Sequence, residues 1–356
     1  SLTWKYILNQ LISGQDLGSR HVDWAMDEIM TGSTPEPILA SFLTSLHMKG
    51  ETSEELGALA RGMLAKAETI DLDVHAVDIV GTGGDQQNTV NISTMAALVI
   101  AGTGATVVKH GNRASTSKSG SADVLEALGI QLDMPIKSVA ACARQVGITF
   151  LFAMTFHPSM RFVGPTRKML GIPTAFNYLG PMTNPARVSS SAIGVANPQM
   201  VEKMAWVFAN RGDHALVFRG DDGLDELTIA TTSQIWEASG GTLQKYVFNP
   251  EGYGIERSSL DNLRGGDAEY NASVFRAVLA GEGESAKDSL HAIRNAVLIN
   301  AAAGLIAYRK NDGRSFEERY TEALTDARQS IDTGAAAQVL NAWVEFSHLA
   351  VETPSP

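Results

Sequence analysis

Apolar residues change their spacing once along this chain of 356 residues, and that change limits the possible folds more than any other feature. Up to about Lys66 they recur three and four positions apart, the spacing of helices that bury one face. From Val74 onward, short runs rich in β-branched residues alternate with helical stretches, which is typical of an α/β domain with a parallel sheet. The pattern predicts a small helical unit followed by a large α/β unit. One compact barrel is the alternative for a chain of this length.

The expected elements follow from this spacing. Four helices are expected at the start of the chain, at 4–11, 22–30, 38–48 and 56–65. Five strands are expected in the α/β part, at 76–80, 106–108, 148–152, 192–195 and 215–218. Segments 227–229, 234–238 and 242–248 are spaced like hairpin strands and predict an antiparallel extension of a mostly parallel central sheet. Four helices are expected to close the chain, at 268–280, 287–308, 316–333 and 335–349.

Charge and cysteine content disfavour several classes of protein. The formal net charge is −11 and lysines and arginines form no continuous run, which argues against binding to nucleic acid or to an anionic membrane. Cys142 is the only cysteine, so an internal disulfide and a cysteine-based zinc site are both excluded. No unbroken apolar run approaches the roughly 20 residues of a membrane-spanning helix. We expect a soluble cytoplasmic protein that acts on small molecules.

A glycine-rich segment after the first expected strand predicts a phosphate site. Residues 81–85 read Gly-Thr-Gly-Gly-Asp, and residues 88–94, Asn-Thr-Val-Asn-Ile-Ser-Thr, lead into a helix. Glycines after a strand let backbone N–H groups converge on an anion, and a helix N-terminus adds its dipole. The segment is not a dinucleotide fingerprint, because the last glycine would fall on Gln86, nor is it a Walker loop. An ordinary connector with helix caps is the alternative.

A second polar segment follows the next expected strand. Residues 109–113, Lys-His-Gly-Asn-Arg, carry two cations, and five hydroxyl side chains lie within 115–121 before the next helix. Two positive charges and several directed donors suit a polyanion. Because this segment and 81–85 both follow parallel strands, they are expected at the edge where open α/β sheets bind ligands. A solvated polar loop would have a similar composition.

An acidic turn after a later strand predicts a metal site. Residues 220–226, Gly-Asp-Asp-Gly-Leu-Asp-Glu, contain four carboxylates. Carboxylate oxygens suit Mg²⁺, which usually takes few protein ligands and completes its shell with water and substrate phosphates. Taken alone, the turn fits a solvated hairpin better. Beside two phosphate-binding segments, it is interpreted as an arm that holds the metal.

The order and spacing of these motifs resemble the anthranilate phosphoribosyltransferases. The matching segments are 81–85, 91–94, 109–113, 180–185 and 225–226, and the resemblance covers essentially the whole chain. It implies transfer of the 5-phosphoribosyl group of phosphoribosyl pyrophosphate to the amine of anthranilate, with release of pyrophosphate, in tryptophan biosynthesis. It also implies a fold of the nucleoside phosphorylase/phosphoribosyltransferase type and a homodimer formed through the helical domain. The helical domain would span 1–72, completed by about 169–185, and the α/β domain would span 73–168 and 186–356.

Carried over motif by motif, the resemblance implies four sets of site residues. Phosphoribosyl pyrophosphate would be held by the two polar loops, at Gly81, Gly84, Asp85, Thr89, Asn91, Ile92, Ser93, Thr94, Lys109, His110, Gly111, Asn112, Arg113, Ala114, Ser115, Thr116, Ser117 and Ser121. Anthranilate would contact Gly81, His110, Asn112, His157 and Arg167. Magnesium, usually two ions in this family, would be held by Ser93, Asp225 and Glu226. The residues that would act in catalysis are Lys109, His110, Asp225 and Glu226.

Two other interpretations use the same features. A pyrimidine nucleoside phosphorylase shares the two-domain architecture but uses phosphate and a nucleoside, and the complete motifs at 81–94 and 109–117 disfavour it. A related nucleic-acid-binding branch keeps the fold without the synthetic activity, and the net charge of −11 disfavours that branch.

Overall fold

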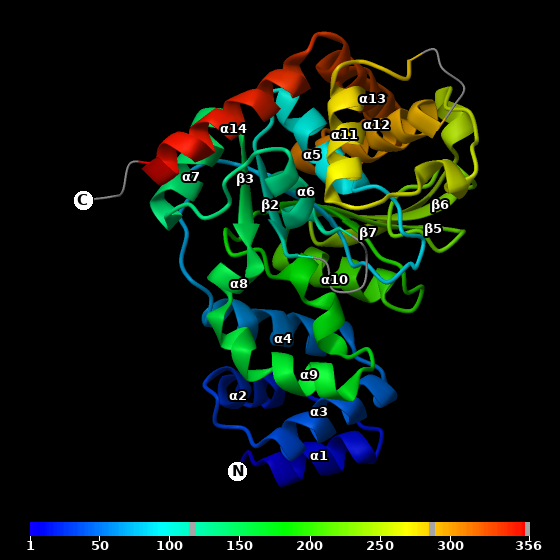
Figure 1. The fold of residues 1–356 in the computed structure, drawn as a ribbon. Helices are drawn as coiled ribbons and strands as arrows, with labels where there is room; N and C mark the ends of the chain where they lie inside the picture. The colour runs from blue at the N-terminus through cyan, green and yellow to red at the C-terminus, as the bar shows by residue number, and fades with distance from the viewer. Residues whose placement is uncertain (114–118, 285–288, 353–356) are drawn as a thin grey trace. The chain divides into compact units, whose positions relative to one another are not determined.

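The computed structural model describes residues 1–113, 119–284 and 289–352. The chain divides into two compact units (Figure 1). Ser1–Thr69 and Ala153–Arg187 form the helical unit, and Ile70–Phe152 and Val188–Pro356 form the α/β unit. The helical unit therefore takes a second segment from the middle of the sequence.

Four helices at the start of the chain confirm the predicted helical segment. They are α1 (Trp4–Ile12), α2 (Ser19–Met30), α3 (Glu36–Lys49) and α4 (Ser53–Ala65). Thr52 begins α4 with a capping box, in which its hydroxyl accepts the N–H of Glu55 and the Glu55 carboxylate accepts the N–H of Thr52. Glu55 is fully buried and also accepts from the Lys49 ammonium at 2.7 Å. Its charge is therefore paired inside the unit.

A segment from the middle of the chain completes the helical unit. It contains α8 (Ala153–Phe156), η1 (Pro158–Phe162), α9 (Gly164–Leu170), η2 (Ala175–Tyr178) and η3 (Gly180–Met182). The Phe156 carbonyl accepts the N–H of Glu68 at 2.8 Å, and the Arg187 guanidinium donates to the Leu64 carbonyl at 3.2 Å. The segment thus begins at Ala153, earlier than the expected residue 169, because the backbone of Phe156 already pairs with Glu68 of this unit.

A seven-stranded sheet forms the centre of the α/β unit and confirms the predicted mostly parallel sheet with an antiparallel extension. Its strands are β1 (Val77–Gly81), β2 (Val107–Gly111), β3 (Ile148–Phe152), β4 (Ser190–Gly194), β5 (His214–Gly220), β6 (Ser233–Ser239) and β7 (Thr242–Phe248). The order is β3-β2-β1-β4-β5-β6-β7, in which the first five strands are parallel and β6 and β7 are antiparallel. Gly240 and Gly241, both at positive φ, make the two-residue turn between β6 and β7.

The prediction of a strand at 227–229 is wrong. Leu227 and Ile229 are fully buried, as on the inner face of a strand, but the backbone of Leu227 pairs with a side chain. Its N–H donates to Asn300 Oδ1 at 2.9 Å, and its carbonyl accepts from Asn300 Nδ2 at 3.1 Å. The alternating burial arises from a packed loop whose polar backbone groups are satisfied by this amide.

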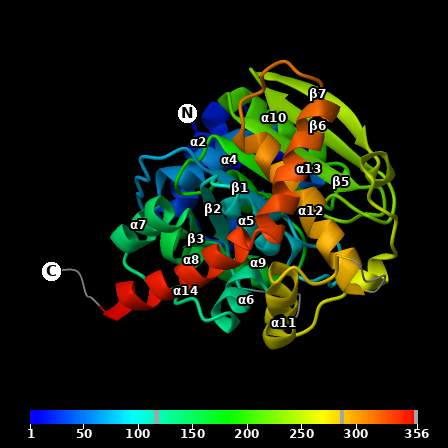
Figure 2. The ribbon, with the colours of Figure 1, turned by 90° about the horizontal axis from the view of Figure 1, so that it is seen from above.

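Two helices form much of the core on the sheet. α5 (Ile92–Gly102) and α12 (Ser289–Tyr308) pack on each other and on β1 (Figure 2). Most of their side chains are buried. Gly304 permits this contact, because a Cβ there would lie 2.3 Å from Ile100 Cδ1. By length and hydropathy α12 could cross a membrane, yet 89% of its apolar window is buried inside this fold, as in the central helix of a folded domain.

Further helices surround this core. They are α6 (Ser121–Ala127), α7 (Ile136–Val146), α10 (Val201–Arg211), α11 (Ala268–Leu279), α13 (Phe316–Asp332) and α14 (Ala335–Glu352), with the short η4 (Pro250–Tyr253) and η5 (Leu260–Leu263). α11 to α14 confirm the four helices predicted for the end of the chain. α10 packs on β5, β6 and β7, and α7 packs on β3.

Candidate active site

The centre of the sheet is the place where the strand order reverses. β1 lies between β2 and β4, and Gly81 at the end of β1 is in register with Gly194 at the end of β4. From β1 the chain continues to β2 and β3 on one side, whereas β4 is followed by β5 on the other. Open α/β sheets bind ligands beyond the carboxyl ends of the strands at such a reversal. The three predicted loops follow β1, β2 and β5, so all three begin at this edge.

Two glycines make room for the acidic arm at this edge. A Cβ on Gly81 would lie 2.4 Å from Asp225 Oδ2, and a Cβ on Gly194 would lie 1.8 Å from the Asp225 carbonyl oxygen. Asp225 Oδ2 in turn accepts the N–H of Gly83 at 2.8 Å. The backbone at Asp225 therefore passes over the ends of β1 and β4 and reaches the first loop. Sequence analysis missed Gly194, whose only signal was a glycine near the end of an expected strand.

The first loop has the backbone of an anion-binding turn. Gly83 and Gly84 have φ values of 74° and 80°, and Gln86 and Asn88 have φ values of 58° and 52°. Residues with positive φ alternate with other residues from Gly84 to Asn88, a pattern that turns successive N–H groups toward one point. Positive φ is uncommon outside glycine and indicates a backbone held by its surroundings.

A segment that the sequence did not single out holds this loop from one side. Two backbone hydrogen bonds join 88–90 to 263–265, from the Val90 N–H to the Leu263 carbonyl and from the Gly265 N–H to the Asn88 carbonyl, each at 2.8 Å. They form an antiparallel bridge between Thr89 and Arg264. A Cβ on Gly265 would lie 2.9 Å from the Thr89 carbonyl oxygen, so glycine allows the close approach. The predicted ligand Thr89 is thereby fixed through its backbone. In the sequence, only the pair Gly265-Gly266 could have indicated that this segment approaches another part of the backbone closely.

The helix after the first loop begins at the predicted phosphate residues. Asn91 is the N-cap of α5, Ile92 is its first residue, and Ser93 and Thr94 lie in its first turn. The cap residue makes no side-chain hydrogen bond to this turn within the described part of the chain. The N–H groups and the positive end of the helix dipole are therefore suited to an external anion. Ile92 and Thr94 are buried, so a ligand would meet their backbone.

Lys109 is buried beneath this helix start. It lies on β2 and is 2% exposed, and its ammonium donates to the Ile79 carbonyl at 2.5 Å and to the Ser93 hydroxyl at 3.3 Å. Burial lowers the pKa of Lys109, while three nearby carboxylates act in the opposite direction. The cation thus lies next to the first turn of α5, as a ligand of a bound polyanion would.

The acidic arm brings buried carboxylates together. Asp225 and Glu226 are 9% and 7% exposed. Burial, followed by the charge of Asp85, raises the pKa of Asp225 to about 8. Burial, followed by the charge of Asp225, raises the pKa of Glu226 well above its usual value. Negative charge gathered with so little water favours a bound cation.

These residues fit Mg²⁺ as a partial set of ligands. Within the described residues, no group of three or more His, Cys, Asp or Glu side chains is arranged to hold a metal ion. Asp225 and Glu226 would supply two carboxylates, and the Ser93 hydroxyl would supply a third oxygen. Mg²⁺ usually binds through one or two carboxylates, with water and substrate phosphates completing its shell. The fit therefore depends on a ligand that carries phosphate.

His110 and Gly111 end β2 beside the second loop. A Cβ on Gly111 would lie 2.7 Å from Ser121 Oγ and 2.9 Å from the Phe150 ring, so a side chain there would have to displace one of them. The N–H of His110 donates to Asp78 Oδ1 at 3.4 Å, and the residue is 4% exposed. The backbone of His110 is therefore fixed at the edge of the sheet, and its side chain is buried there.

The second loop is joined to α6 where it is described. Arg113 pairs with Asp123 at 3.3 Å and with Glu126 at 2.5 Å, so its charge is already engaged by two carboxylates. The Asn112 carbonyl accepts the Ser121 hydroxyl at 3.4 Å. Four predicted ligands lie outside the described residues, namely Ala114, Ser115, Thr116 and Ser117.

Two residues predicted to contact anthranilate belong to the helical unit. His157 is 3% exposed, donates through Nε2 to the Thr183 carbonyl at 2.9 Å, and has its pKa lowered by burial. Arg167 lies in α9, donates through Nη2 to Asn177 Oδ1 at 3.4 Å, and also has its pKa lowered by burial. The other predicted residues that the structure describes lie in the α/β unit.

Comparison with known proteins agrees with this geometry. A glycosyl transferase family matches in two parts, its helical bundle domain over residues 5–67 and its a/b domain over residues 73–337. The anthranilate phosphoribosyltransferase of Arthrobacter sp. (strain FB24) is 53% identical over 345 residues, which cover 97% of this chain and 96% of the relative.

Solved structures of the same enzyme have the same fold. The crystal structure of anthranilate phosphoribosyltransferase from Thermus thermophilus matches with a TM-score of 0.87 and 36% identity, covering 96% of this chain and 99% of that one. The enzyme from Saccharomyces cerevisiae in complex with PRPP and Mg matches with a TM-score of 0.87 and 28% identity, covering 97% and 98%. Together with the phosphate loops and the acidic arm at the strand-order reversal, these matches mean that the chain belongs to the anthranilate phosphoribosyltransferase family.

Proposed function

We propose that this chain transfers the 5-phosphoribosyl group of phosphoribosyl pyrophosphate to the amine of anthranilate. The products are N-(5-phosphoribosyl)anthranilate and pyrophosphate, and the step belongs to tryptophan biosynthesis. The observation that carries the proposal is the meeting of Lys109, the start of α5 and the buried pair Asp225 and Glu226 at one edge of the sheet. That edge combines donors for a pyrophosphate with oxygens for its metal. Membership of the family supports the same reaction.

The residues of the α/β unit would act on the leaving group. Displacement of pyrophosphate from the anomeric carbon builds negative charge on the leaving group and positive charge on the ribose, so positioning and electrostatics carry the catalysis. The buried Lys109 ammonium and the N–H groups at the start of α5 are fixed donors for that negative charge. Fixed donors need little reorganisation during the reaction. No side chain is required as a nucleophile.

The reaction is proposed to need Mg²⁺, with two ions per subunit held by Ser93, Asp225 and Glu226. Bound Mg²⁺ neutralises charge on the departing pyrophosphate. The raised pKa values of the two carboxylates support this assignment, because a cation would relieve the repulsion that raises them. The yeast relative was solved with PRPP and Mg, which supports the same metal.

Anthranilate is proposed to contact both a guanidinium and the end of β2. The planar Arg167 guanidinium suits a carboxylate, with which it can form two parallel hydrogen bonds. His110 and Asn112 would orient the amine, and Gly81 and His157 would contact the ring. The amine is neutral at physiological pH and loses its proton only as the new bond forms, so no strong base is needed.

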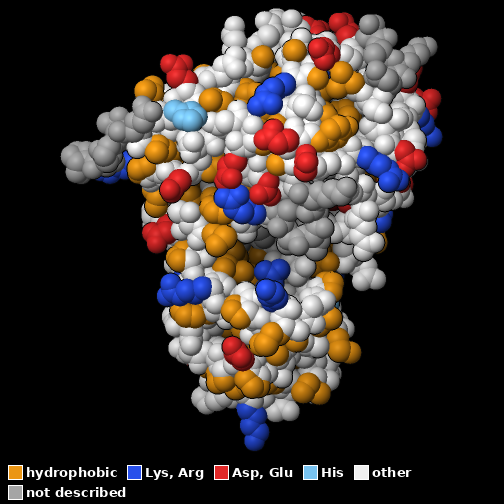
Figure 3. All heavy atoms as spheres, viewed as in Figure 1, with side chains coloured by type: hydrophobic (Ala, Val, Ile, Leu, Met, Phe, Trp, Pro, Cys, Tyr) orange, Lys and Arg blue, Asp and Glu red, His pale blue; other side chains and the backbone are white. Residues whose placement is uncertain are grey.

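The subunits are proposed to pair through the helical unit. Ile12, Met48 and Met169 are 76%, 84% and 70% exposed, and all three belong to this unit. In the view of Figure 3, groups of hydrophobic side chains lie on the surface of the helical unit, whereas charged side chains are more frequent over the α/β unit. Exposed apolar surface of this kind favours a protein partner. Sedimentation equilibrium would give the mass of a dimer, and a monomer at micromolar concentration would contradict the assignment.

The chain is proposed to act in the cytoplasm. Cys142 is the only cysteine of the sequence and is fully buried, so no internal disulfide would benefit from an oxidising compartment. Fractionation of cells that produce the chain would check its location.

The test of the reaction follows the fluorescence of anthranilate together with the release of pyrophosphate. Loss of fluorescence that matches pyrophosphate in amount, and that a chelator abolishes, is the expected result. A parallel sample with phosphate and a pyrimidine nucleoside tests the phosphorylase alternative and should yield no free base. Binding of phosphoribosyl pyrophosphate without transfer to anthranilate would contradict the proposed acceptor.

A further inference from the structure

Asn271 on α11 is a buried polar residue that has no part in the mechanism above. It is 2% exposed, and its side-chain amide makes three contacts. Oδ1 accepts the N–H of Gly266 at 2.9 Å, and Nδ2 donates to the Gly266 carbonyl at 3.3 Å and to Asn91 Oδ1 at 3.1 Å. One amide thus holds both a turn of the 263–266 segment and the side chain of Asn91, the N-cap residue of α5.

Asn91 extends this contact to the second loop. Its Nδ2 donates to the Ser119 carbonyl at 3.1 Å, and its Oδ1 accepts from Asn271. Ser119 belongs to the second polar segment and is its first described residue after 113, and Asn91 ends the first loop. Both ends of the Asn91 amide are therefore used inside the protein, so the side chain joins the two loops.

We propose that Asn271 is a positioning residue for phosphoribosyl pyrophosphate and that it acts through Asn91. The proposal rests on the function proposed above and assigns a role to a residue that does not touch the substrate. Without the donor from Asn271, the Asn91 amide would be free to rotate and its contact with Ser119 would weaken. The start of α5 and the second loop would then lose their fixed spacing, on which simultaneous contact with a phosphate and a pyrophosphate depends.

The effect of Asn271 should be specific for one substrate. The two backbone hydrogen bonds between the first loop and 263–265 do not involve residue 271 directly, so the fold of the loop does not depend on this amide alone. Asn271 also belongs to the α/β unit, whereas Arg167, the proposed ligand of the anthranilate carboxylate, belongs to the helical unit. We therefore expect weaker binding of phosphoribosyl pyrophosphate and unchanged use of anthranilate.

The experiment is a double-mutant cycle on the full chain. Asn271→Ala, Asn91→Ala and the double variant are titrated with phosphoribosyl pyrophosphate and Mg²⁺ by calorimetry, and both KM values and kcat are measured. Asn271→Ala should raise Kd and KM for phosphoribosyl pyrophosphate about tenfold, the effect of one buried hydrogen bond. The KM for anthranilate should change less than about twofold. When Asn91 is already alanine, adding Asn271→Ala should change Kd less than about twofold, because the Asn91 side chain through which Asn271 is proposed to act is absent.

Asn295→Ala is the matched control. Asn295 is a buried asparagine on α12 whose side-chain amide contacts His291 of the same helix at 3.2 Å. This variant should keep both KM values while losing a comparable amount of stability. Two results would overturn the proposal. One is that Asn271→Ala changes the Kd for phosphoribosyl pyrophosphate equally in the wild-type and the Asn91→Ala chain. The other is that Asn271→Ala raises the KM for anthranilate as much as the KM for phosphoribosyl pyrophosphate.

A second variant tests the proposal even if Asn271→Ala fails to fold. Asn271→Asp keeps an acceptor for the N–H of Gly266 and removes the Nδ2 donor to Asn91 and to the Gly266 carbonyl, so it should reproduce the weaker binding with an intact unfolding transition. Wild-type affinity in a folded Asn271→Asp chain would contradict the proposal. Because calorimetry needs no turnover, a wild-type chain that binds phosphoribosyl pyrophosphate but transfers nothing to anthranilate would refute the proposed function and leave the role of Asn271 testable.

Discussion

Gly194 ends β4 beneath the carbonyl oxygen of Asp225. Glycine is needed there because a Cβ would lie 1.8 Å from that oxygen and 2.4 Å from the Asp225 carbonyl carbon. The neighbouring Thr82 N–H donates to the Gly194 carbonyl at 2.9 Å, so the strand end cannot shift without disturbing the first loop. Backbone, rather than a flexible side chain, would have to move to accept a methyl group.

Replacing Gly194 by alanine should therefore move the acidic arm. We expect Gly194→Ala to lower kcat/KM by about a hundredfold, since displacement of a site group by about 1 Å can cost that much. Stability should fall by about 1–3 kcal/mol, the usual cost of overpacking. Steady-state kinetics and urea unfolding check both values. Gly252→Ala is the control, because a Cβ on Gly252 would meet no atom within 4 Å and its φ is not positive; activity in Gly194→Ala equal to that control would contradict the account.

Asp225 illustrates the conflict between stability and function in one side chain. Burial, followed by the charge of Asp85, raises its pKa to about 8. An acid whose folded pKa exceeds its unfolded value destabilises the folded state as the pH rises above the unfolded value. Near neutral pH, without metal, this carboxylate therefore works against folding.

Replacing Asp225 by asparagine should stabilise the metal-free protein. The amide oxygen can still accept the N–H of Gly83, and the repulsion disappears, so Asp225→Asn should gain roughly 1–3 kcal/mol at pH 7. Transfer should fall by roughly a hundredfold or more, because a proposed metal ligand is lost. Thermal unfolding at pH 7, with and without Mg²⁺, checks the first effect. If the metal-free variant were less stable than the metal-free wild type, the Asp225 carboxylate would not be destabilising the fold.

Sequence alone could predict the polar residues of the loops because they follow expected strands and have a family resemblance. It could not predict that Lys109 is buried against Ile79, because that depends on how β2 packs beside β1. Gly194 and Asn271 were also missed. Each meets a partner far away in the sequence, and a lone glycine or asparagine does not indicate which partner it meets.

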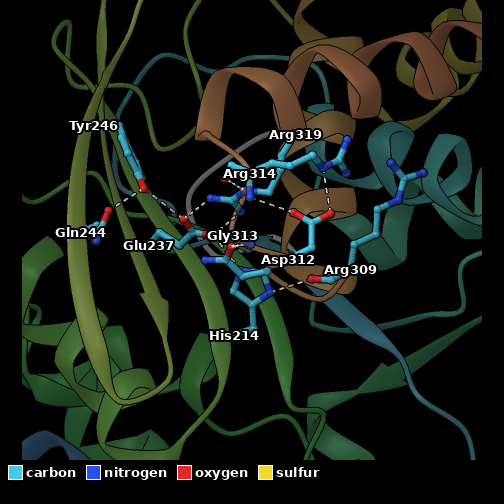
Figure 4. A network of polar contacts seen from close by, with 10 residues as sticks. His214, Glu237, Gln244, Tyr246, Arg309, Asp312, Gly313, Arg314 and Arg319 are labelled. Carbon is cyan, nitrogen blue, oxygen red and sulfur yellow. Dashed lines mark hydrogen bonds and ion pairs between the residues drawn. The ribbon is translucent and has the colours of Figure 1, made fainter.

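At the scale of elements, a buried ion pair joins the antiparallel extension to α13. Figure 4 shows Glu237 of β6 receiving hydrogen bonds from both Nη atoms of Arg319, at 2.7 and 2.8 Å, and from His214 Nε2 at 2.8 Å. Burial by itself would raise the pKa of Glu237, but the hydrogen bonds from Arg319 and His214 outweigh it and lower the pKa to about 2. The pair thus ties β5, β6 and α13 together.

The stability contributed by Glu237 should depend on pH. Because its folded pKa lies below that of an unfolded glutamate, the contribution is complete above about pH 4.3 and is lost as the pH falls through about 2. Glu237→Gln should cost about 2 kcal/mol at pH 7, since Arg319 loses its counter-charge. The difference between wild type and variant should shrink steadily below about pH 4. Urea unfolding at several pH values measures it, and a difference independent of pH would contradict the role of the charge.

Element positions were the most predictable part of the fold. The helices of both ends and the strands β1 to β7 follow the periodicity of apolar residues, which reports one buried face directly. The segment 227–229 has the same alternation but no neighbouring strand, because Asn300 takes its hydrogen bonds. Periodicity indicates which side chains are buried and does not indicate what pairs with the backbone.

At the scale of the whole molecule, the residues proposed to bind the two substrates are divided between the two units. The phosphate loops and the acidic arm belong to the α/β unit, whereas His157 and Arg167 belong to the segment 153–187 of the helical unit. The sequence predicted both units, but it did not predict that the second segment of the helical unit runs from 153 to 187. Short turns rich in glycine and proline lack the periodicity that assigns longer helices to a core.

This division predicts that one substitution in the helical unit separates the two substrates. Arg167→Ala should raise the KM for anthranilate roughly 10–100-fold, because a carboxylate loses hydrogen bonds to a charged partner. Calorimetric affinity for phosphoribosyl pyrophosphate should stay within about threefold, because the donors proposed for the pyrophosphate are in the α/β unit. Arg161→Ala is the matched control, since Arg161 lies in the same segment with its guanidinium 4.6 Å from the Phe162 ring centre. Equal loss of both substrates in Arg167→Ala would mean that this arginine supports the fold of the segment, and the ligand of the anthranilate carboxylate would then have to be sought elsewhere.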